Sequence, residues 1–226
     1  MLDETVQNQL KKLTALFLEE NTKLNLSAFR TEEDCWHGNV LDSLAATELQ
    51  YFSQAKEGAR VLDIGTGGGF PLLPLAIAYP AIRFTGLDST QKKIDAIGRI
   101  VTDMGLSNVE LICGRTEELG CEAEYREQFD IVAARALAPL NTLLEYASPF
   151  VKPKGHIVCW KSMRIEQELK DSLLARAELS CQLIAQHTYA LPEKWGQRQL
   201  IIFEKRGPIA VAYPRAVGIP KKSPLL

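Results

Sequence analysis

The chain has 226 residues, of which 46% are hydrophobic and 24% are charged, and its formal net charge at pH 7 is −2. This length suits one α/β domain with terminal extensions, and it excludes two full domains. No apolar run approaches the ~18 residues of a membrane-spanning helix and no signal peptide precedes the first predicted helix, so we expect a soluble, cytoplasmic protein.

The five cysteines and three histidines are scattered along the chain. No two cysteines form a C-x-x-C pair, and the histidines lack the spacing of metal ligands. We therefore expect reduced cysteines in the core, and neither a disulfide framework nor a metal site.

The N-terminal segment predicts two helices. Apolar residues recur at spacings of three, four and seven over residues 2–25, which indicates an amphipathic helix. A second helix is expected over residues 34–52. Because both precede the first predicted strand, residues 1–58 are expected to form a helical lid over the sheet.

Residues 59–71 read A-R-V-L-D-I-G-T-G-G-G-F-P, a pattern typical of a buried strand, a tight glycine turn and a helix start. A dinucleotide fingerprint, G-x-G-x-x-G, would require glycine where Phe70 stands. The pattern present, D-x-G-x-G-x-G, resembles motif I of the class I S-adenosylmethionine-dependent methyltransferases. A glycine turn without a ligand and a nicotinamide site remain alternatives at this point.

A second strand, residues 82–87, ends in Asp88. The distance from the glycines is close to the ~20 residues at which an acid meets the two hydroxyls of a ribose. This carboxylate is therefore the predicted partner of the cofactor's ribose.

The chain then alternates between strands and helices. Such alternation predicts a doubly wound, Rossmann-like α/β fold, with a seven-stranded, mostly parallel sheet, an antiparallel last strand and N-terminal helices. Residues 59–205 would form the S-adenosylmethionine-binding domain, and residues 206–226 an extended basic tail. Strands are expected at 60–64, 82–87, 109–113, 129–134, 155–161, 181–191 and 199–203, and helices at 70–79, 90–104, 140–151 and 165–179.

Basic residues concentrate in the C-terminal third. Residues 152–226 contain thirteen lysines and arginines against six acids, whereas the rest of the chain is acidic. The basic part is either an ordinary solvated surface or an electrostatic footprint for a polyanion.

The loop after the fourth strand reads A-A-R-A-L-A-P-L from Ala133, and methyltransferases carry their catalytic motif at this place. It contains neither an N-P-P-Y-like tetrapeptide nor a cysteine after proline, but it does contain Arg135. A guanidinium cannot act as a base, although it can orient an oxygen or a phosphate. A methyl acceptor such as guanine N7 carries a free lone pair and needs no base to deprotonate it. Its methylation would need only correct positioning, so Arg135 is the candidate catalytic residue. A purely structural salt bridge to Asp63 or Glu117 is the alternative.

Several motifs together resemble the RsmG (GidB) family: N-L-S at 25–27, H-G-N-V-L-D-S-L at 37–44, the glycine motif at 63–75, L-D-S at 87–89, R-T-E-E at 115–118, and Y-P-R-A-V-G-I-P-K-K-S-P-L at 213–225. Members of that family methylate N7 of one guanine in bacterial 16S ribosomal RNA with S-adenosylmethionine. The resemblance implies a partner that is 16S ribosomal RNA or the small ribosomal subunit. It also implies cofactor contacts at Gly65, Gly67, Phe70, Asp88, Thr116, Glu117 and Arg135.

RNA contacts are expected from basic residues near the strand ends and in the tail, mostly with phosphates. These candidates are Lys161, Arg164, Arg198, Arg215, Lys221 and Lys222. Trp160 and Trp195 could stack on bases, although a tryptophan within a strand is more often part of the core. We expect a monomer. The remaining alternatives are a small-molecule or protein methyltransferase and a non-catalytic binding module on the same scaffold.

Overall fold

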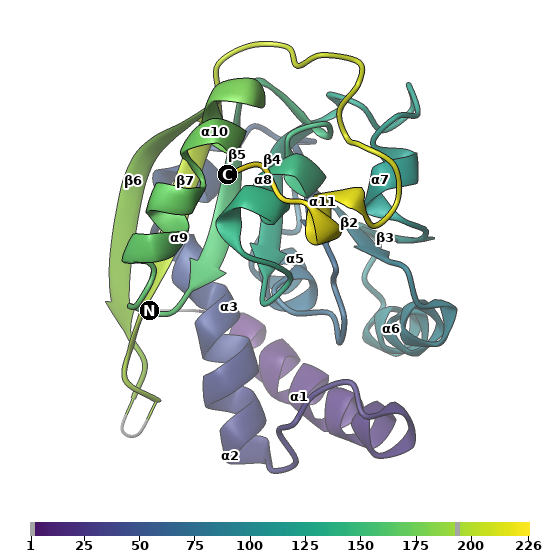
Figure 1. The fold of residues 1–226 in the computed structure, drawn as a ribbon. Helices are drawn as coiled ribbons and strands as arrows, with labels where there is room; N and C mark the ends of the chain where they lie inside the picture. Colours follow the sequence, from purple (N-terminus) through teal and green to yellow (C-terminus); the bar gives the residue numbers. More distant parts are fainter. Residues whose placement is uncertain (1–2, 193–194) are drawn as a thin grey trace.

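The computed structural model describes residues 3–192 and 195–226. A single seven-stranded sheet runs through the centre of this part of the chain (Figure 1). Its strands are β1 (Arg60–Ile64), β2 (Arg83–Asp88), β3 (Val109–Cys113), β4 (Phe129–Arg135), β5 (Val151–Lys161), β6 (Cys181–Ala190) and β7 (Gln197–Lys205).

The strand order is β3-β2-β1-β4-β5-β7-β6. β1 to β5 pair in parallel, and β7 runs antiparallel to both β5 and β6. The predicted doubly wound fold with an antiparallel last strand is confirmed. The order reverses between β1 and β4, which is the point where sheets of this kind bind ligands at the carboxyl ends of their strands.

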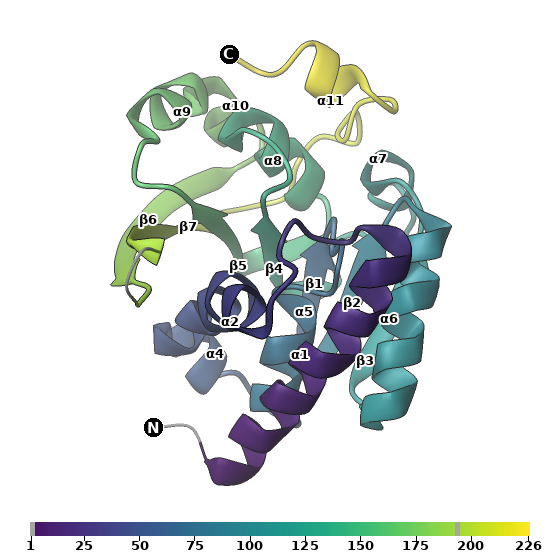
Figure 2. The same cartoon turned by 90° about the horizontal axis from the view of Figure 1, so that it is seen from below.

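The helices and single turns are α1 (Glu4–Leu24), α2 (Glu32–Cys35), the π-helix η1 (Trp36–Leu41), α3 (Asp42–Leu44), the 3₁₀-helix η2 (Ala45–Glu48), α4 (Gln50–Ser53), α5 (Leu72–Ala78), α6 (Gln91–Met104), α7 (Thr116–Leu119), α8 (Leu140–Ala147), α9 (Glu166–Asp171), α10 (Leu173–Glu178) and α11 (Ile219–Lys222). Figure 2 shows them on both sides of the sheet, with α1, α5 and α6 on one side and α8 to α11 on the other.

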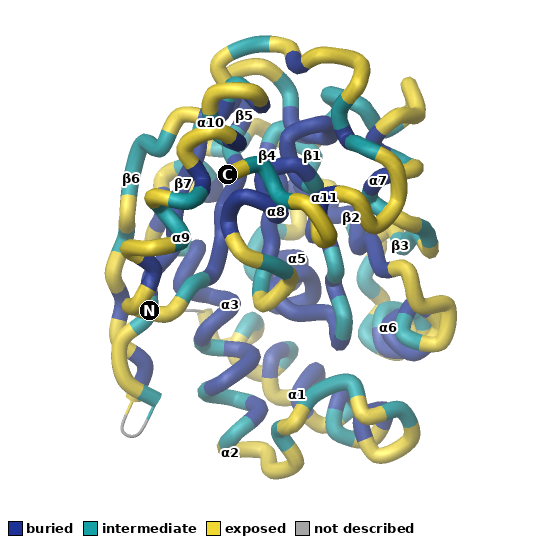
Figure 3. The backbone as a smooth tube through the Cα atoms, in the orientation of Figure 1, coloured by how far each residue is buried: buried dark blue, intermediate teal, exposed yellow. Residues whose placement is uncertain are grey.

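Two hydrophobic clusters lie between these layers. One joins α1, η1, α5 and α6 to the sheet, and the other joins α8, α10 and Ile209 of the tail to its opposite face. The central strands are buried on both faces (Figure 3), which explains why they read as continuous apolar runs in the sequence. Because Leu10, Leu13 and Phe17 of α1 belong to the same core as β1, the division of the chain at residue 58 stays a prediction.

The single helix predicted over residues 34–52 is wrong. The chain forms five short elements there, from α2 to α4, and Leu49 adopts an extended backbone between the last two. Gly38 lies in the π-helix, where a Cβ would stand 2.5 Å from the Phe29 ring and 2.6 Å from Trp195. The π-helix thus packs its backbone closely against Phe29 and Trp195 at Gly38. The spacing of apolar residues in the sequence does not report such packing.

Four other predictions differ from the structure. The helix expected over 140–151 ends at Ala147, because Pro149 follows and cannot continue it, and β5 begins at Val151 rather than at 155. The helix expected over 165–179 is divided into α9 and α10 at Ser172. The tail is not extended throughout, since it contains α11 and buries Pro220. The predicted loop at 192–198 includes residues 193–194, which lie outside the described residues.

Candidate active site

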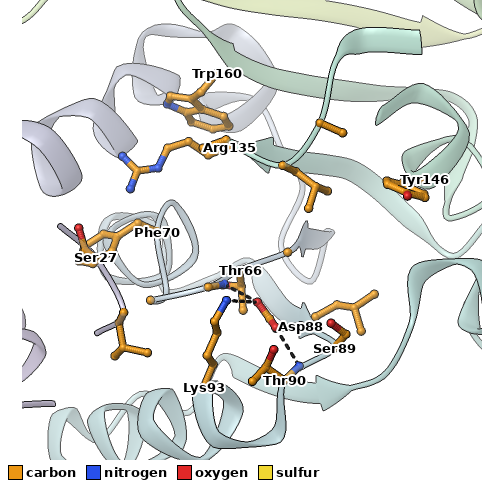
Figure 4. Close-up of a pocket in the computed structure, with 18 of the residues that line it drawn as sticks. Ser27, Thr66, Phe70, Asp88, Ser89, Thr90, Lys93, Arg135, Tyr146 and Trp160 are labelled. Carbon is orange, nitrogen blue, oxygen red and sulfur yellow. Dashed lines mark hydrogen bonds and ion pairs between the residues drawn. The ribbon is translucent and has the colours of Figure 1, made fainter. Parts of the chain in front are cut away.

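A cavity of about 850 Å³ lies at the carboxyl ends of β1, β2 and β4. Its wall combines the glycine loop after β1, the end of β2, the start of α7, the loop after β4, and η1 (Figure 4). All seven predicted cofactor residues line this one cavity, namely Gly65, Gly67, Phe70, Asp88, Thr116, Glu117 and Arg135. Their individual roles stay predictions, but the sequence grouped them correctly in space.

The glycine loop has a backbone that other residues rarely adopt. Gly65, Gly67 and Gly69 have φ values of +69°, +58° and +88°. The amide of Gly65 donates to the Leu87 carbonyl oxygen at 2.7 Å, which closes the loop onto β2. A Cβ at Gly65 would stand 2.6 Å from a methyl group of Leu137, which could move aside, so this position favours glycine chiefly because of its φ of +69°.

The loop after β4 approaches the glycine loop from the other side. Ala136 has a φ of +53°, which is uncommon for a residue with a side chain. The chain therefore turns sharply after Arg135, and Leu137 packs over Gly65 while remaining 36% exposed. This turn gives the cavity an apolar rim next to Arg135.

Asp88 is held in a fixed orientation at the end of β2. Its carboxylate accepts hydrogen bonds from the amides of Gly67 at 3.0 Å and Thr90 at 2.9 Å, and Lys93 Nζ lies 3.6 Å away (Figure 4). A carboxylate has about four acceptor positions. Acceptor capacity therefore remains for the hydroxyls of a ribose in the cavity.

Glu117 connects the cavity to the C-terminal tail. One of its oxygens accepts from the Thr116 hydroxyl at 3.1 Å, and the other accepts from the amide of Gly218 at 3.0 Å. The side chain is mostly buried. Glu117 thus positions the tail beside the α7 wall of the cavity.

Arg135 extends from the end of β4 toward η1 (Figure 4). Its Nη1 donates to the Gly38 carbonyl oxygen and to Asp42 Oδ2, both at 2.8 Å, and its Nη2 donates to Asn39 Oδ1 at 2.6 Å. The salt bridge considered from the sequence therefore exists, but the predicted partners Asp63 and Glu117 are wrong. Asp42 takes that place because η1 packs against the end of β4.

Asp63, at the end of β1, is completely enclosed beside the glycine loop. In the described structure neither carboxylate oxygen has a hydrogen-bonding partner. Burial raises the pKa of Asp63 to about 7, and the nearby Thr66 and Arg135 offset only part of this effect. The folded protein therefore favours the neutral acid at this position well above the pH at which free aspartate ionises.

Comparison with known proteins identifies the family. Residues 6–201 match the model of the GidB family, described as rRNA small subunit methyltransferase G. The chain belongs to this family. A relative from Thermoanaerobacter sp. (strain X514), named ribosomal RNA small subunit methyltransferase G, is 39% identical over 95% of this chain and 88% of its own length. A relative of the same name from Deinococcus radiodurans is 40% identical over 97% of this chain and 85% of its own length.

Solved structures support the fold of this GidB family chain. TYW2 of M. jannaschii, solved in complex with AdoMet, aligns with a TM-score of 0.53 at 15% identity, over 72% of this chain and 74% of its own. A SAM-dependent methyltransferase from Methanosarcina mazei aligns with a TM-score of 0.52 at 14% identity, over 70% of this chain and 97% of its own. At these identities the similarity shows the fold, which is that of class I methyltransferases.

The predicted RNA-binding residues are placed in two different ways in this family member. Lys161, Arg198 and Lys221 line the cavity. Arg164 and Lys222 are exposed and lie close in the sequence to Lys161 and Lys221.

Three of these side chains are already engaged in the folded protein, since Arg198 Nε lies 3.5 Å from Asp42 Oδ1. Lys161 donates to the Ala138 carbonyl oxygen at 2.8 Å and to Glu168 at 2.6 Å. Arg215 binds the completely buried Glu145 and does not line the cavity. RNA contacts by the six basic residues stay predictions, and those of Lys161, Arg198 and Arg215 would compete with existing ion pairs.

Trp160, two residues of η1 and Asp42 at the start of α3 complete the site. Trp160 is buried, and its Nε1 donates to the Asp42 carbonyl oxygen at 2.7 Å, so the core interpretation of this tryptophan is the better one. Sequence reasoning missed Gly38, Asn39 and Asp42 as site residues. The motif H-G-N-V-L-D-S-L contains all three, and its resemblance to the family was the available signal.

Within residues 3–192 and 195–226, no group of three histidine, cysteine or acidic side chains could hold a metal ion. In the same ranges, no helix is both long and apolar enough to cross a membrane.

Proposed function

We propose that this protein transfers a methyl group from S-adenosylmethionine to N7 of one guanine in 16S ribosomal RNA, acting as a cytoplasmic monomer. The observation that carries the proposal is the cavity itself. In a chain of the rRNA small subunit methyltransferase G family, the glycine loop, Asp88 and Arg135 all face one cavity at the switch point of the sheet.

The residues of the cavity fit this cofactor. The volume of about 850 Å³ is within the ~300–1,000 Å³ of small-molecule sites, and Asp88 retains acceptor capacity for a ribose. Gly65 and Gly67 let the backbone approach the ligand closely, and Phe70, Thr116 and Glu117 would complete its binding site. When bound, S-adenosylmethionine supplies an electrophilic methyl group on a positively charged sulfur.

The chain's own part in the reaction is to position the guanine. N7 carries an in-plane lone pair beside the O6 acceptor, so no residue has to remove a proton. Arg135 stays protonated and can donate an N–H to O6, which leaves the N7 lone pair free to attack. Holding two reactants in line can lower a barrier by ~7–11 kcal/mol without a general base.

Substrate RNA would approach across the basic C-terminal third. Lys221 lines the cavity and Lys222 is exposed next to it, so both can contact phosphates close to the target base. Arg164 and Arg198 would extend this contact along the ends of β5 and β7. The tail would thus align the RNA while Arg135 meets the base.

Incubation with methyl-labelled S-adenosylmethionine tests the proposal. Naked 16S RNA and small ribosomal subunits that lack the modification are the two substrates, and the RNA is digested to nucleosides afterwards. We expect label in 7-methylguanosine, and the better substrate shows whether assembly matters. Label in a different nucleoside, or in neither RNA while the cofactor still binds, would contradict the proposal and favour a small-molecule or protein substrate.

A further inference from the structure

The π-helix η1 and Asp42, the residue directly after it, place three hydrogen-bond acceptors around the guanidinium of Arg135. They are the carbonyl oxygen of Gly38, the side-chain oxygen of Asn39 and the carboxylate of Asp42. Their distances to Arg135 nitrogens are between 2.6 and 2.8 Å. Three acceptors from five consecutive residues therefore enclose one cation.

The irregular helix makes this arrangement possible. In an α-helix the Gly38 carbonyl would accept the amide of Asp42, but here that amide donates to the Asn39 carbonyl oxygen. The Gly38 oxygen accepts from Arg135. π-helical segments are rare and occur mostly at functional sites, where they reorient particular groups.

Asp42 is itself fixed from three strands. Its Oδ1 accepts from the Tyr189 hydroxyl of β6 at 2.6 Å, and Arg198 Nε of β7 lies 3.5 Å from the same oxygen. Its carbonyl oxygen accepts from Trp160 of β5. The side chain is only 6% exposed, so these contacts hold the carboxylate in a mostly buried position.

The contacts leave a defined part of Arg135 available. Both N–H groups of Nη1 and one of Nη2 are occupied, whereas Nε–H and the second Nη2–H have no partner among the described residues. The ring centre of Phe70 lies 5.8 Å from the guanidinium carbon, and the side chain stays 17% exposed in the cavity wall. The two remaining donors are those that a ligand in the cavity can use.

We propose that Asp42, assisted by Gly38 and Asn39, is the positioning residue that holds Arg135 in the one orientation that presents these two donors to the target base. The identity of that base rests on the proposed function. The pairing of Asp42 with Arg135 does not, because it is a property of the folded chain.

The central experiment is a double-mutant cycle on methyl transfer to small ribosomal subunits. Asp42→Asn keeps the size of the side chain but removes the charge that orients Arg135. Since a misplacement of about 1 Å can cost a factor of ~100, we expect kcat to fall by ~10- to 100-fold. The double variant D42N/R135Q should be no slower than R135Q alone, because both changes remove one function. Independent, multiplying losses would overturn the proposal.

A rescue and a control separate positioning from stability. In D42N/N39D the carboxylate moves to the other side chain that already bonds to Arg135, and we expect most of the lost kcat to return. Glu20→Gln is the matched control, because it breaks the ion pair of a buried acid with Arg99, between α1 and α6 and outside the cavity. It should lower the melting temperature and leave kcat unchanged. A loss of kcat in E20Q equal to that in D42N, or no rescue by N39D, would contradict the positioning role.

Nitrogen-15 NMR of the arginine side chains gives a measurement that does not depend on activity. Arg135, assigned by the signals missing in R135Q, should show separate, slowly exchanging Nη signals in the wild type and merged signals in D42N. Merged signals in the wild type would overturn the proposal. If D42N does not fold, Asn39→Ala removes one acceptor and enters the same cycle. Should the wild type methylate another base, the proposed function fails, while the NMR result still decides the pairing.

Discussion

The Asp63→Asn variant should become more stable relative to wild type as the pH rises. The acid is completely buried at the end of β1, and its pKa is raised from 3.8 to about 7. Between these two values the folded state binds a proton that the unfolded state has lost, so stability falls as the pH rises through this window and is constant above it. Asparagine has nearly the same shape and no charge to bury.

The magnitude follows from the size of the shift. A difference of about 3 pKa units corresponds to ~4 kcal/mol at ~1.36 kcal/mol per unit. Relative to wild type, we expect the free energy of unfolding of D63N to gain under ~1 kcal/mol at pH 4 and ~4 kcal/mol at pH 8, beyond any constant offset.

Urea denaturation of both proteins from pH 4 to pH 8 measures this difference. Asp130→Asn is the control, because this carboxylate is 39% exposed, pairs with a lysine on β5, and should show no comparable gain. A difference between D63N and wild type that does not change with pH would refute the reasoning, since it would mean that Asp63 is ionised in the folded protein at no cost.

Three other changes test the glycine loop and the tail. Gly65→Ala places a Cβ 2.6 Å from a methyl group of Leu137 at a φ of +69°, so we expect at least tenfold weaker S-adenosylmethionine binding by calorimetry, and unchanged affinity would show that the loop does not contact the cofactor. Glu145→Gln weakens the buried attachment of Arg215, and we expect a stability loss of ~3 kcal/mol with faster tryptic cleavage of the tail. Lys221→Gln should weaken RNA binding and reduce its salt dependence by about one phosphate contact, and an identical salt slope would remove Lys221 from the RNA site.

The local parts of the fold could be predicted from the sequence because their causes are local. Continuous apolar runs predicted the buried strands, and the glycine motif predicted the turn after β1, since only glycine adopts its φ values easily. The helix over 34–52 could not be predicted correctly. Its irregular course depends on Phe29 and Trp195 packing against Gly38, and no spacing in the sequence reports those contacts.

The grouping of the predicted cofactor residues in one cavity was predictable for a similar reason. Asp88 ends the second strand and Thr116 lies just beyond the third, and neighbouring parallel strands end at the same edge of the sheet. The partner of Arg135 was not predictable. Asp42 lies 93 residues earlier in the chain and meets Arg135 only after η1 has packed against the sheet.

Mapping the modified position in 16S RNA tests the central claim most directly. 7-Methylguanosine becomes a site of strand scission after borohydride and aniline treatment. Small subunits that lack the modification should therefore be cut at one guanine after incubation with the protein and S-adenosylmethionine, and should remain uncut when either is omitted. Scission at one guanine would establish base, atom and polymer together. No scission, with transferred label in another nucleoside, would contradict methylation at N7.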